Sequence, residues 1–124
     1  APAPLEEALK LSPYIDQVML YGFNRPNNVA LIVASMPAVE QFAQKNGISG
    51  SGEGLLSESR IRDLFKEELS IFGKDFKSFE HPDNFALLAD EWSIENGLLT
   101  PTLKLKREVV EQKFKDQIES LYSE

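Results

Sequence analysis

The chain has 124 residues and a formal net charge of −7, from 13 lysines and arginines against 20 aspartates and glutamates. Its hydrophobic share of 42% is ordinary for a globular domain and too high for a disordered chain. The acidic balance argues against general binding of nucleic acid or of anionic membranes. With no cysteine and a single histidine, the chain excludes a disulfide framework, thiolate chemistry and a multi-histidine metal site within itself.

The N-terminal third predicts a short helix followed by a β-hairpin. Its first prolines fit the first turn of a helix at 4–11, which ends before Pro13. Residues 15–22 and 29–35 are apolar strands joined by the turn "NRPNN", and the second is apolar enough to be buried on both faces. The opening "APAPLEEALK" is not a signal peptide, so a native start that has lost its Met and a piece cut from a longer protein both stay open. No stretch reaches the roughly 18 apolar residues of a membrane span.

The rest of the chain predicts three helices and one more strand. A helix at 36–47 ends at an Asn-Gly pair, and four glycines in 47–54 indicate a flexible connection. Ser57 is the predicted N-cap of the next helix. The apolar stripe of that helix comprises Ile61, Leu64, Phe65, Leu69 and Phe72. A strand at 84–92 follows, and the last helix begins near Arg107. Its stripe comprises Val110, Phe114, Ile118 and Leu121. Helices and strands interleave, which predicts one small α+β domain.

Several polar patterns have ordinary structural explanations. The glycine-rich segment lacks the Gly-Lys-Ser/Thr ending of a phosphate-binding P-loop, so a linker is favoured. His81 precedes a proline in a polar turn and has no visible partner for a general-base role. Asp90 and Glu91 are neighbours on the predicted strand and would point to opposite faces, which excludes a carboxylate dyad. The glutamate pairs at 6–7 and 67–68 are interpreted as solvated helix faces.

Two isolated arginines are candidates for gripping a phosphate. Arg25 lies at the tip of the predicted hairpin turn, where an exposed cation needs no functional explanation. Arg62 lies one position off the apolar stripe of its helix, which is typical of a surface residue with a buried stem. The surface interpretation is favoured for both residues.

The stretch "NGLLTPTLKLKR", residues 96–107, is the local exception in an acidic chain. It concentrates Lys104, Lys106 and Arg107 within four positions, just before the last helix. Cations at a helix N-terminus oppose the helix dipole, so a purely structural role explains them poorly. The Thr-Pro-Thr run suits an extended, exposed loop. A lysine on such a loop could be inserted into another domain's active site, where it would stabilise a developing phosphate charge.

This stretch, with "VVEQKFKDQIESLY" after it, closely resembles the C-terminal end of AMP-forming long-chain acyl-CoA synthetases, members of the adenylate-forming superfamily. The superfamily's last core motif ends in a pattern like Gly-Lys-x-x-Arg. Here Leu103 stands in the place of the glycine, before Lys104, and the long-chain branch characteristically makes that replacement. Residues 1–34 look like the segment just after the family's interdomain hinge, so the resemblance covers nearly the whole chain.

The resemblance implies that residues 1–124 are the small C-terminal mobile (lid) domain, with a β-hairpin, a further short sheet and flanking helices. The family activates a carboxylic acid with Mg-ATP, giving an acyl-adenylate and pyrophosphate, and CoA then attacks to give acyl-CoA and AMP. The resemblance makes Lys104 the lysine of the first step. It places Thr100 and Thr102 near the nucleotide, and Lys106 and Arg107 in orienting or docking the loop.

For the thioester step, the resemblance implies a rotation of this domain that presents another face to CoA. That face would include residues 1–5, with Tyr21, Gly22, Arg25 and Arg62 as further CoA-side candidates. The family's ATP, Mg²⁺ and acyl-chain sites belong to a large N-terminal domain, and no counterpart is found in this sequence. The expected partners are therefore that domain, the fatty acid, ATP and CoA, in a cytoplasmic enzyme that touches membranes at most peripherally. No metal site is expected here.

A different class of function stays open from the sequence. The same fold could serve as a stand-alone interaction domain that lacks catalysis and uses the basic loop to dock an acidic partner. The acid that a parent enzyme would activate is also open, because nothing in this chain contacts the acyl chain.

Overall fold

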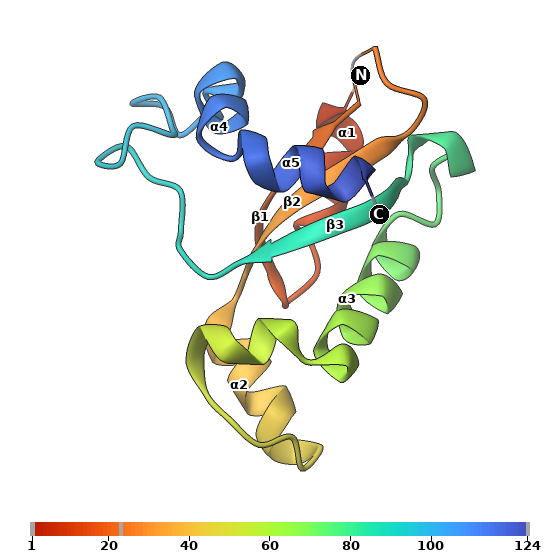
Figure 1. Cartoon of the computed structure of the whole chain (residues 1–124), viewed down its shortest axis with the longest axis vertical. Coiled ribbons are helices and arrows are strands. Elements are labelled where there is room, and N and C mark those ends of the chain that lie inside the picture. Colours follow the sequence, from red (N-terminus) through yellow and green to blue (C-terminus); the bar gives the residue numbers. More distant parts are fainter. Residues whose placement is uncertain (1, 23, 124) are drawn as a thin grey trace.

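A three-stranded sheet lies at the centre of the computed structural model, which describes residues 2–22 and 24–123. Strand β1 (Ile15–Tyr21) pairs antiparallel with β2 (Asn28–Ala34), which confirms the predicted hairpin. Strand β3 (Pro82–Leu88) adds to the other side of β2 in parallel, giving the order β1-β2-β3. The central strand β2 is buried on both faces, as its apolar sequence predicts (Figure 1).

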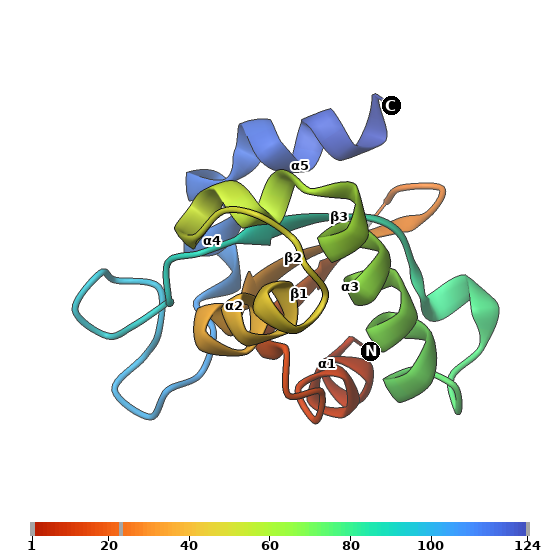
Figure 2. The same cartoon turned by 90° about the horizontal axis from the view of Figure 1, so that it is seen from below.

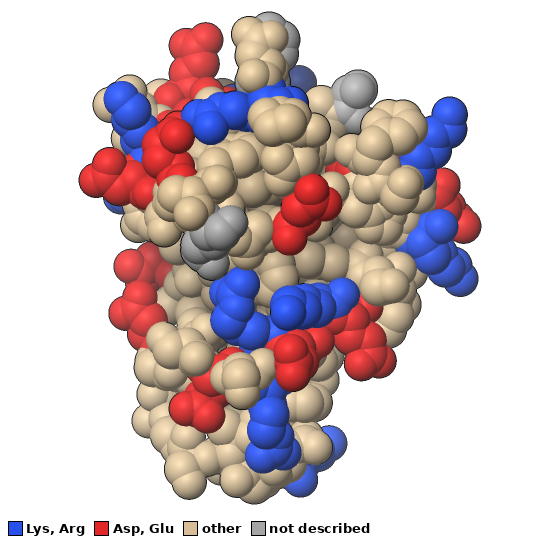
Figure 3. All heavy atoms as spheres, turned by 45° about the vertical axis from the view of Figure 1, so that its right-hand side comes forward, with Lys and Arg blue, Asp and Glu red and all other residues tan. Residues whose placement is uncertain are grey.

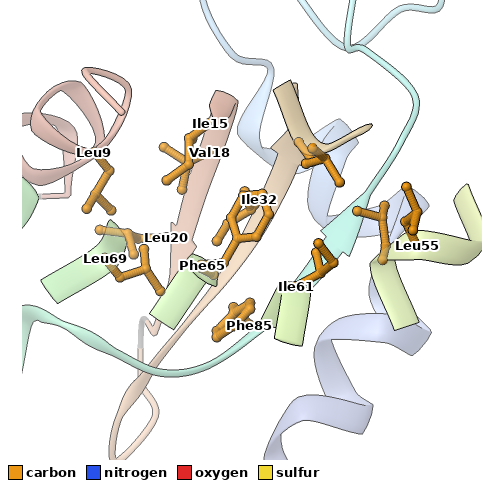
Figure 4. Close-up of a cluster of buried hydrophobic side chains, with 14 of the residues drawn as sticks. Leu9, Ile15, Val18, Leu20, Ile32, Leu55, Ile61, Phe65, Leu69 and Phe85 are labelled. Carbon is orange, nitrogen blue, oxygen red and sulfur yellow. The ribbon is translucent and has the colours of Figure 1, made fainter. Parts of the chain in front are cut away.

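Helices cover both faces of this sheet, which confirms the α+β class (Figure 2). One face packs against α1 (Ala3–Leu9), α2 (Met36–Lys45), the 3₁₀ helix η1 (Gly52–Ser57) and α3 (Ser59–Phe72). Figure 4 shows this core, in which Phe65 of α3 and Phe85 of β3 meet the aliphatic side chains of β1 and β2. Burial of such side chains contributes about 1.5–3 kcal/mol each.

The opposite face of the sheet is covered by the C-terminal quarter of the chain. Helices α4 (Arg107–Lys113) and α5 (Lys115–Tyr122) pack there with Trp92, Leu98 and Leu99. Between β3 and α4, residues 89–106 form a long connection that projects beyond the sheet in both views (Figures 1 and 2). The stretch with the cluster of cations lies on this projection.

The structure corrects several local predictions. Ser57 is not the N-cap of α3: it ends η1, because the burial of Leu55 and Leu56 draws the glycine-rich segment into a 3₁₀ turn. Strand β3 ends at Leu88, so Asp90 lies beyond it and the strand alternation used against a dyad does not apply. Asp90 and Glu91 are both exposed.

The C-terminal region differs from the prediction in two further respects. The last helix is interrupted at Phe114, whose backbone leaves the helical region. Strand β3 joins the β1–β2 hairpin in one sheet and does not form a second sheet. After β3, the only β pairing among the described residues is an isolated bridge between Leu99 and Leu105. None of the described helices has the length and apolar character that crossing a membrane requires.

Candidate functional site

Residues 98–106 form a small hairpin, here called the Lys104 hairpin. The Lys106 N–H donates to the carbonyl oxygen of Leu98 at 3.0 Å, and the Thr100 N–H donates to that of Lys104 at 2.8 Å. The turn is closed by the Leu103 N–H, which donates to the carbonyl oxygen of Thr100 at 2.8 Å. Lys104 therefore lies on an ordered turn and not on a loose extended loop.

The tip of the hairpin depends on an unusual backbone conformation. Leu103 has a φ of +66°, in the left-handed region, which closes a three-residue hairpin loop. Glycine is the residue that suits this conformation best, and in other residues it costs about 1–2 kcal/mol. The side chain of Leu103 gains no burial in return, since it is 67% exposed. Leu103 thus keeps a strained conformation directly before Lys104.

The base of the hairpin is anchored in the core. Leu98 and Leu99 are buried under the sheet. Asn96 shapes the preceding turn: its Oδ1 accepts the Ser93 N–H at 2.9 Å, and its Nδ2 donates to the carbonyl oxygen of Glu91 at 2.9 Å. One end of this turn is tied to β1, because the Gln17 amide exchanges hydrogen bonds of 2.7 and 2.9 Å with the Trp92 backbone.

The polar side chains of the hairpin divide into an outward and an inward group. Thr102, Lys104 and Lys106 are exposed, and among the residues that the structure describes Lys104 makes no ion pair. Arg107 turns inward instead, where both of its terminal nitrogens donate to the carboxylate of Glu6 on α1. Of the three clustered cations, Lys104 and Lys106 are thus presented to solvent, and Arg107 is already bound.

Tyr21 and Gly22 border a groove of about 520 Å³, here called the Tyr21 groove. Its wall also includes Leu5, Leu20 and the 74% exposed Phe79. A Cβ at Gly22 would lie 1.8 Å from the Asn28 Oδ1, so a side chain there would force the Asn28 side chain to move. Of the N-terminal residues predicted beside this face, Pro2 and Leu5 line the groove, and Ala1 lies outside the described residues.

Arg25 is not the free cation that its place in the hairpin turn suggests. Its guanidinium lies 4.4 Å from the ring centre of Tyr122 and 5.7 Å from that of Tyr21, and it pairs with Glu119 of α5. The Tyr122 hydroxyl donates to the carbonyl oxygens of Asn27 at 2.8 Å and Tyr21 at 3.1 Å. Burial raises the pKa of Tyr122 above 10, and the charge of Arg25 opposes that rise. These contacts tie the end of α5 to the β1–β2 turn.

Arg62 lies on a different surface from Tyr21 and Gly22. Its guanidinium lies 4.3 Å from the ring centre of Phe85 and donates to the Phe85 carbonyl oxygen at 3.2 Å, so it covers the outer edge of β3. A separate groove of about 550 Å³ runs there between η1 and α5. Arg62 was expected to reach solvent as a surface residue, but its charged end stays against the protein.

The sequence interpretation missed Glu6 and Glu68, which were expected to be solvated. Glu6 is 4% exposed and Glu68 is 8% exposed, and Glu68 accepts the Ser12 hydroxyl at 2.6 Å. A signal was present for Glu6, because it stands three positions before the buried Leu9 and so shares its helix face. What the sequence did not reveal was its partner, Arg107, which is 101 positions away.

The face drawn in Figure 3 carries charges of both signs. On this face, lysines and arginines lie beside aspartates and glutamates and form no broad basic field. Among the described residues, no three His, Cys, Asp or Glu side chains are grouped as metal ligands would be. The features that stand out are therefore the Lys104 hairpin and the Tyr21 groove.

Comparison with known proteins shows that the chain is similar to parts of acyl-CoA ligases and of adenylation domains. No protein-family profile matches the chain. It is 34% identical to long-chain-fatty-acid–CoA ligase 1 of Cavia porcellus over 99% of its length, 36% to long chain acyl-CoA synthetase 8 of Arabidopsis thaliana over 96%, and 37% to long-chain-fatty-acid–CoA ligase 5 of Rattus norvegicus over 98%. The chain spans only 17% to 18% of the length of these relatives.

Solved structures agree with these sequence relatives. The adenylation domain of the carboxylate reductase from Mycobacterium chelonae superposes with a TM-score of 0.79 at 25% identity, over 98% of this chain and 18% of that one. The adenylation and carrier didomain of the Segniliparus rugosus carboxylic acid reductase, in complex with AMP, gives 0.77 at 25% identity, over 99% of this chain and 16% of that one. The resemblance inferred from the sequence is thereby confirmed.

Proposed function

Because the chain is homologous to long-chain fatty acid–CoA ligases over nearly its whole length, we propose that it is the small mobile domain of such an enzyme and supplies Lys104 to its adenylation step. The observation that carries this proposal is the Lys104 hairpin: it is anchored in the core, and it presents an ammonium without an ion pair among the described residues.

The chemistry of adenylation explains why such a lysine is useful. An oxygen of the substrate carboxylate attacks the α-phosphorus of Mg-ATP, the bond to the pyrophosphate oxygen breaks, and acyl-adenylate and pyrophosphate result. Negative charge gathers around the phosphorus as the anionic acid approaches. An ammonium placed beside these oxygens offsets that charge, and removing one preorganised donor of this kind typically costs about 10²–10³ in rate. Residues outside this chain would hold the Mg²⁺ and the adenine.

Thr100, Thr102 and Lys106 are proposed to support Lys104 in different ways. Thr100 binds the backbone of Lys104 and shapes the turn. The exposed Thr102 and Lys106 flank it and could contact the nucleotide or the surface of the large domain. Arg107 is proposed to orient the hairpin, because its guanidinium is already bound by Glu6.

The Tyr21 groove is proposed as part of the wall along which CoA reaches the acyl-adenylate. Its lining of apolar side chains next to Asn28 and Glu80 suits an extended arm that carries amide groups. Arg25 is held by Glu119 and two tyrosines, and Arg62 faces another groove, so neither gives this proposal its support. Tyr21 and Gly22 carry it.

The adenylation lysine can be tested in the full-length protein that contains this chain. Pyrophosphate release with palmitate and Mg-ATP is compared between wild type, Lys104→Ala and the matched control Lys45→Ala, which removes another exposed lysine. Lys104→Ala should lower pyrophosphate release by about 10²–10³ and largely spare thioester formation from supplied acyl-adenylate. Lys45→Ala should leave both steps unchanged. Equal loss in both half-reactions of Lys104→Ala would refute the role given to Lys104.

Two alternatives are separated by simple observations. An interaction domain that docks an acidic partner through the hairpin predicts a reading frame that does not continue upstream into an ATP-binding domain. A carboxylic acid reductase, the class named for the solved structures above, is the second alternative. The higher identities to ligases, 34% to 37% against 25%, favour a ligase.

A further inference from the structure

The carboxylate of Glu6 accepts three hydrogen bonds from two distant parts of the chain. It is 4% exposed. Its Oε2 accepts the backbone N–H of Leu20 at 2.7 Å and the Nη1 of Arg107 at 3.0 Å, while Oε1 accepts Nη2 of Arg107. One side chain of α1 therefore holds both strand β1 and the residue that follows the Lys104 hairpin.

The geometry of Arg107 makes this contact a directional one. Arg107 is the first residue of α4 and lies three positions after Lys104, so it fixes the C-terminal end of the hairpin. A planar guanidinium that binds a carboxylate through two parallel hydrogen bonds resists rotation as well as separation. A lysine in its place would keep the charge and lose the second bond.

The Glu6–Arg107 pair also lies between the two candidate surfaces. Arg107 lines the Tyr21 groove on one side. On the other it lines a groove of about 390 Å³ that Lys104 and Leu103 share with Glu6 and Glu7. The pair thus connects the hairpin to α1.

We infer that Arg107 is a positioning residue for Lys104 and that Glu6 is its anchor, so that the adenylation rate depends on a pair that touches no substrate. This inference rests on the proposed function of Lys104. It assigns the Arg107 guanidinium to the carboxylate of Glu6 and not to the nucleotide, and it adds Glu6, which has no other assigned role. The hairpin hydrogen bonds set the shape of the turn, and the Glu6–Arg107 pair sets its direction relative to the sheet.

The test uses conservative variants, because removing Arg107 outright would leave the buried carboxylate of Glu6 without its charged partner and could unfold the domain. Arg107→Lys keeps the positive charge and loses the pair of parallel hydrogen bonds to Glu6. Glu6→Gln keeps an acceptor for the Leu20 N–H and loses the negative charge. Arg60→Lys is the matched control, because Arg60 is exposed and donates to the Asn46 carbonyl oxygen far from the hairpin. All are compared in wild-type and Lys104→Ala backgrounds of the full-length enzyme.

Positioning predicts a particular pattern of rates. Arg107→Lys and Glu6→Gln should each lower the maximal rate of pyrophosphate release by about 10- to 100-fold, the effect of displacing a reacting group by up to about 1 Å. The KM for ATP should change little in both variants, and the thioester step should change little in Glu6→Gln, because Glu6 does not line the Tyr21 groove. In the Lys104→Ala background neither variant should cause further loss, because the group that they position is gone. Losses that multiply in the double variants would overturn the inference.

A second measurement on the 124-residue chain separates failure of this inference from failure of the proposed function. Amide hydrogen exchange of Thr100, Lys104 and Lys106 should quicken in Arg107→Lys, while central β2 amides such as Leu31 stay protected. Unchanged exchange at the hairpin would overturn the positioning role whatever Lys104 does. If the exchange quickens but Lys104→Ala has normal activity, the proposed function fails and the role in adenylation fails with it.

Discussion

Thr100 holds Lys104 from both sides: its Oγ1 accepts the Lys104 N–H at 3.1 Å, and its own N–H donates to the Lys104 carbonyl oxygen at 2.8 Å. The backbone bond belongs to any hairpin of this kind, but the side-chain bond needs a hydroxyl at this position. Thr102 lies close enough to extend the network, with its Oγ1 3.1 Å from that of Thr100. The residue before the proline therefore determines how firmly the lysine is held.

Replacing the Thr100 hydroxyl should loosen the hairpin without altering its surface. Thr100→Val keeps the branched shape and loses the hydrogen bonds of the hydroxyl to the Lys104 N–H and to the Thr102 hydroxyl, each worth about 1 kcal/mol. We expect pyrophosphate release to fall several-fold and amide exchange at Lys104 to quicken, with thioester formation unaffected. Thr100→Ser retains the acceptor and should behave like wild type. A Ser variant as impaired as the Val variant would show that the hydroxyl alone does not hold the lysine and that the methyl group is needed as well.

Leu103 gives a prediction of the opposite sign. Its φ of +66° costs about 1–2 kcal/mol, which a glycine would avoid. Glycine also gives the unfolded chain more conformational freedom, which destabilises the folded state by about 0.5–1 kcal/mol. Leu103→Gly should therefore stabilise the domain by up to about 1.5 kcal/mol in urea unfolding. Leu103→Ala keeps the strain and removes only an exposed side chain, so its stability should stay within about 0.5 kcal/mol of wild type.

A glycine variant less stable than wild type would contradict the left-handed conformation of Leu103. If stability rises while adenylation falls, the exposed leucine itself has a use at the hairpin tip, such as a contact with the large domain. Stability and activity should therefore be measured on the same variant.

The parts of the fold that depend on local pattern could be predicted from the sequence. The apolar run of β2 and the 3.6-residue stripe that includes Ile61 and Phe65 each identify an element without knowledge of its neighbours. The position of β3 could not be deduced in this way, because a parallel strand pairs across a connection that local turn signals do not describe.

The candidate site was predictable to a similar extent. Lys104 follows from the motif, and its exposure follows from the Thr-Pro-Thr turn. The ion pair of Arg107 could not be predicted from the motif, because its partner Glu6 comes from the other end of the chain. Arg25 was misjudged for the same reason, since α5 supplies both Glu119 and Tyr122. Residue type indicates which groups can bind a phosphate, and long-range packing decides which of them remain free.

The contact between Tyr122 and the β1–β2 turn predicts a specific loss of stability at alkaline pH. Burial raises the pKa of Tyr122 above 10 in the folded protein, while the unfolded chain keeps the ordinary value. The folded state thus favours the protonated hydroxyl, which donates to the carbonyl oxygens of Asn27 and Tyr21. This contribution is complete below about pH 10 and is lost as the pH rises through the folded-state pKa.

The free energy of unfolding in urea, measured from about pH 8 to about pH 11, should therefore decline more steeply for wild type than for Tyr122→Phe. The Phe variant lacks the hydroxyl and should be less stable throughout the lower part of this range, by about 1 kcal/mol for the hydrogen bonding that it loses. The two curves should converge at high pH, because wild type loses the same contribution there by ionisation. Parallel curves would mean that the hydroxyl ionises equally easily in the folded and unfolded states, which would contradict the raised pKa of Tyr122 in the folded protein.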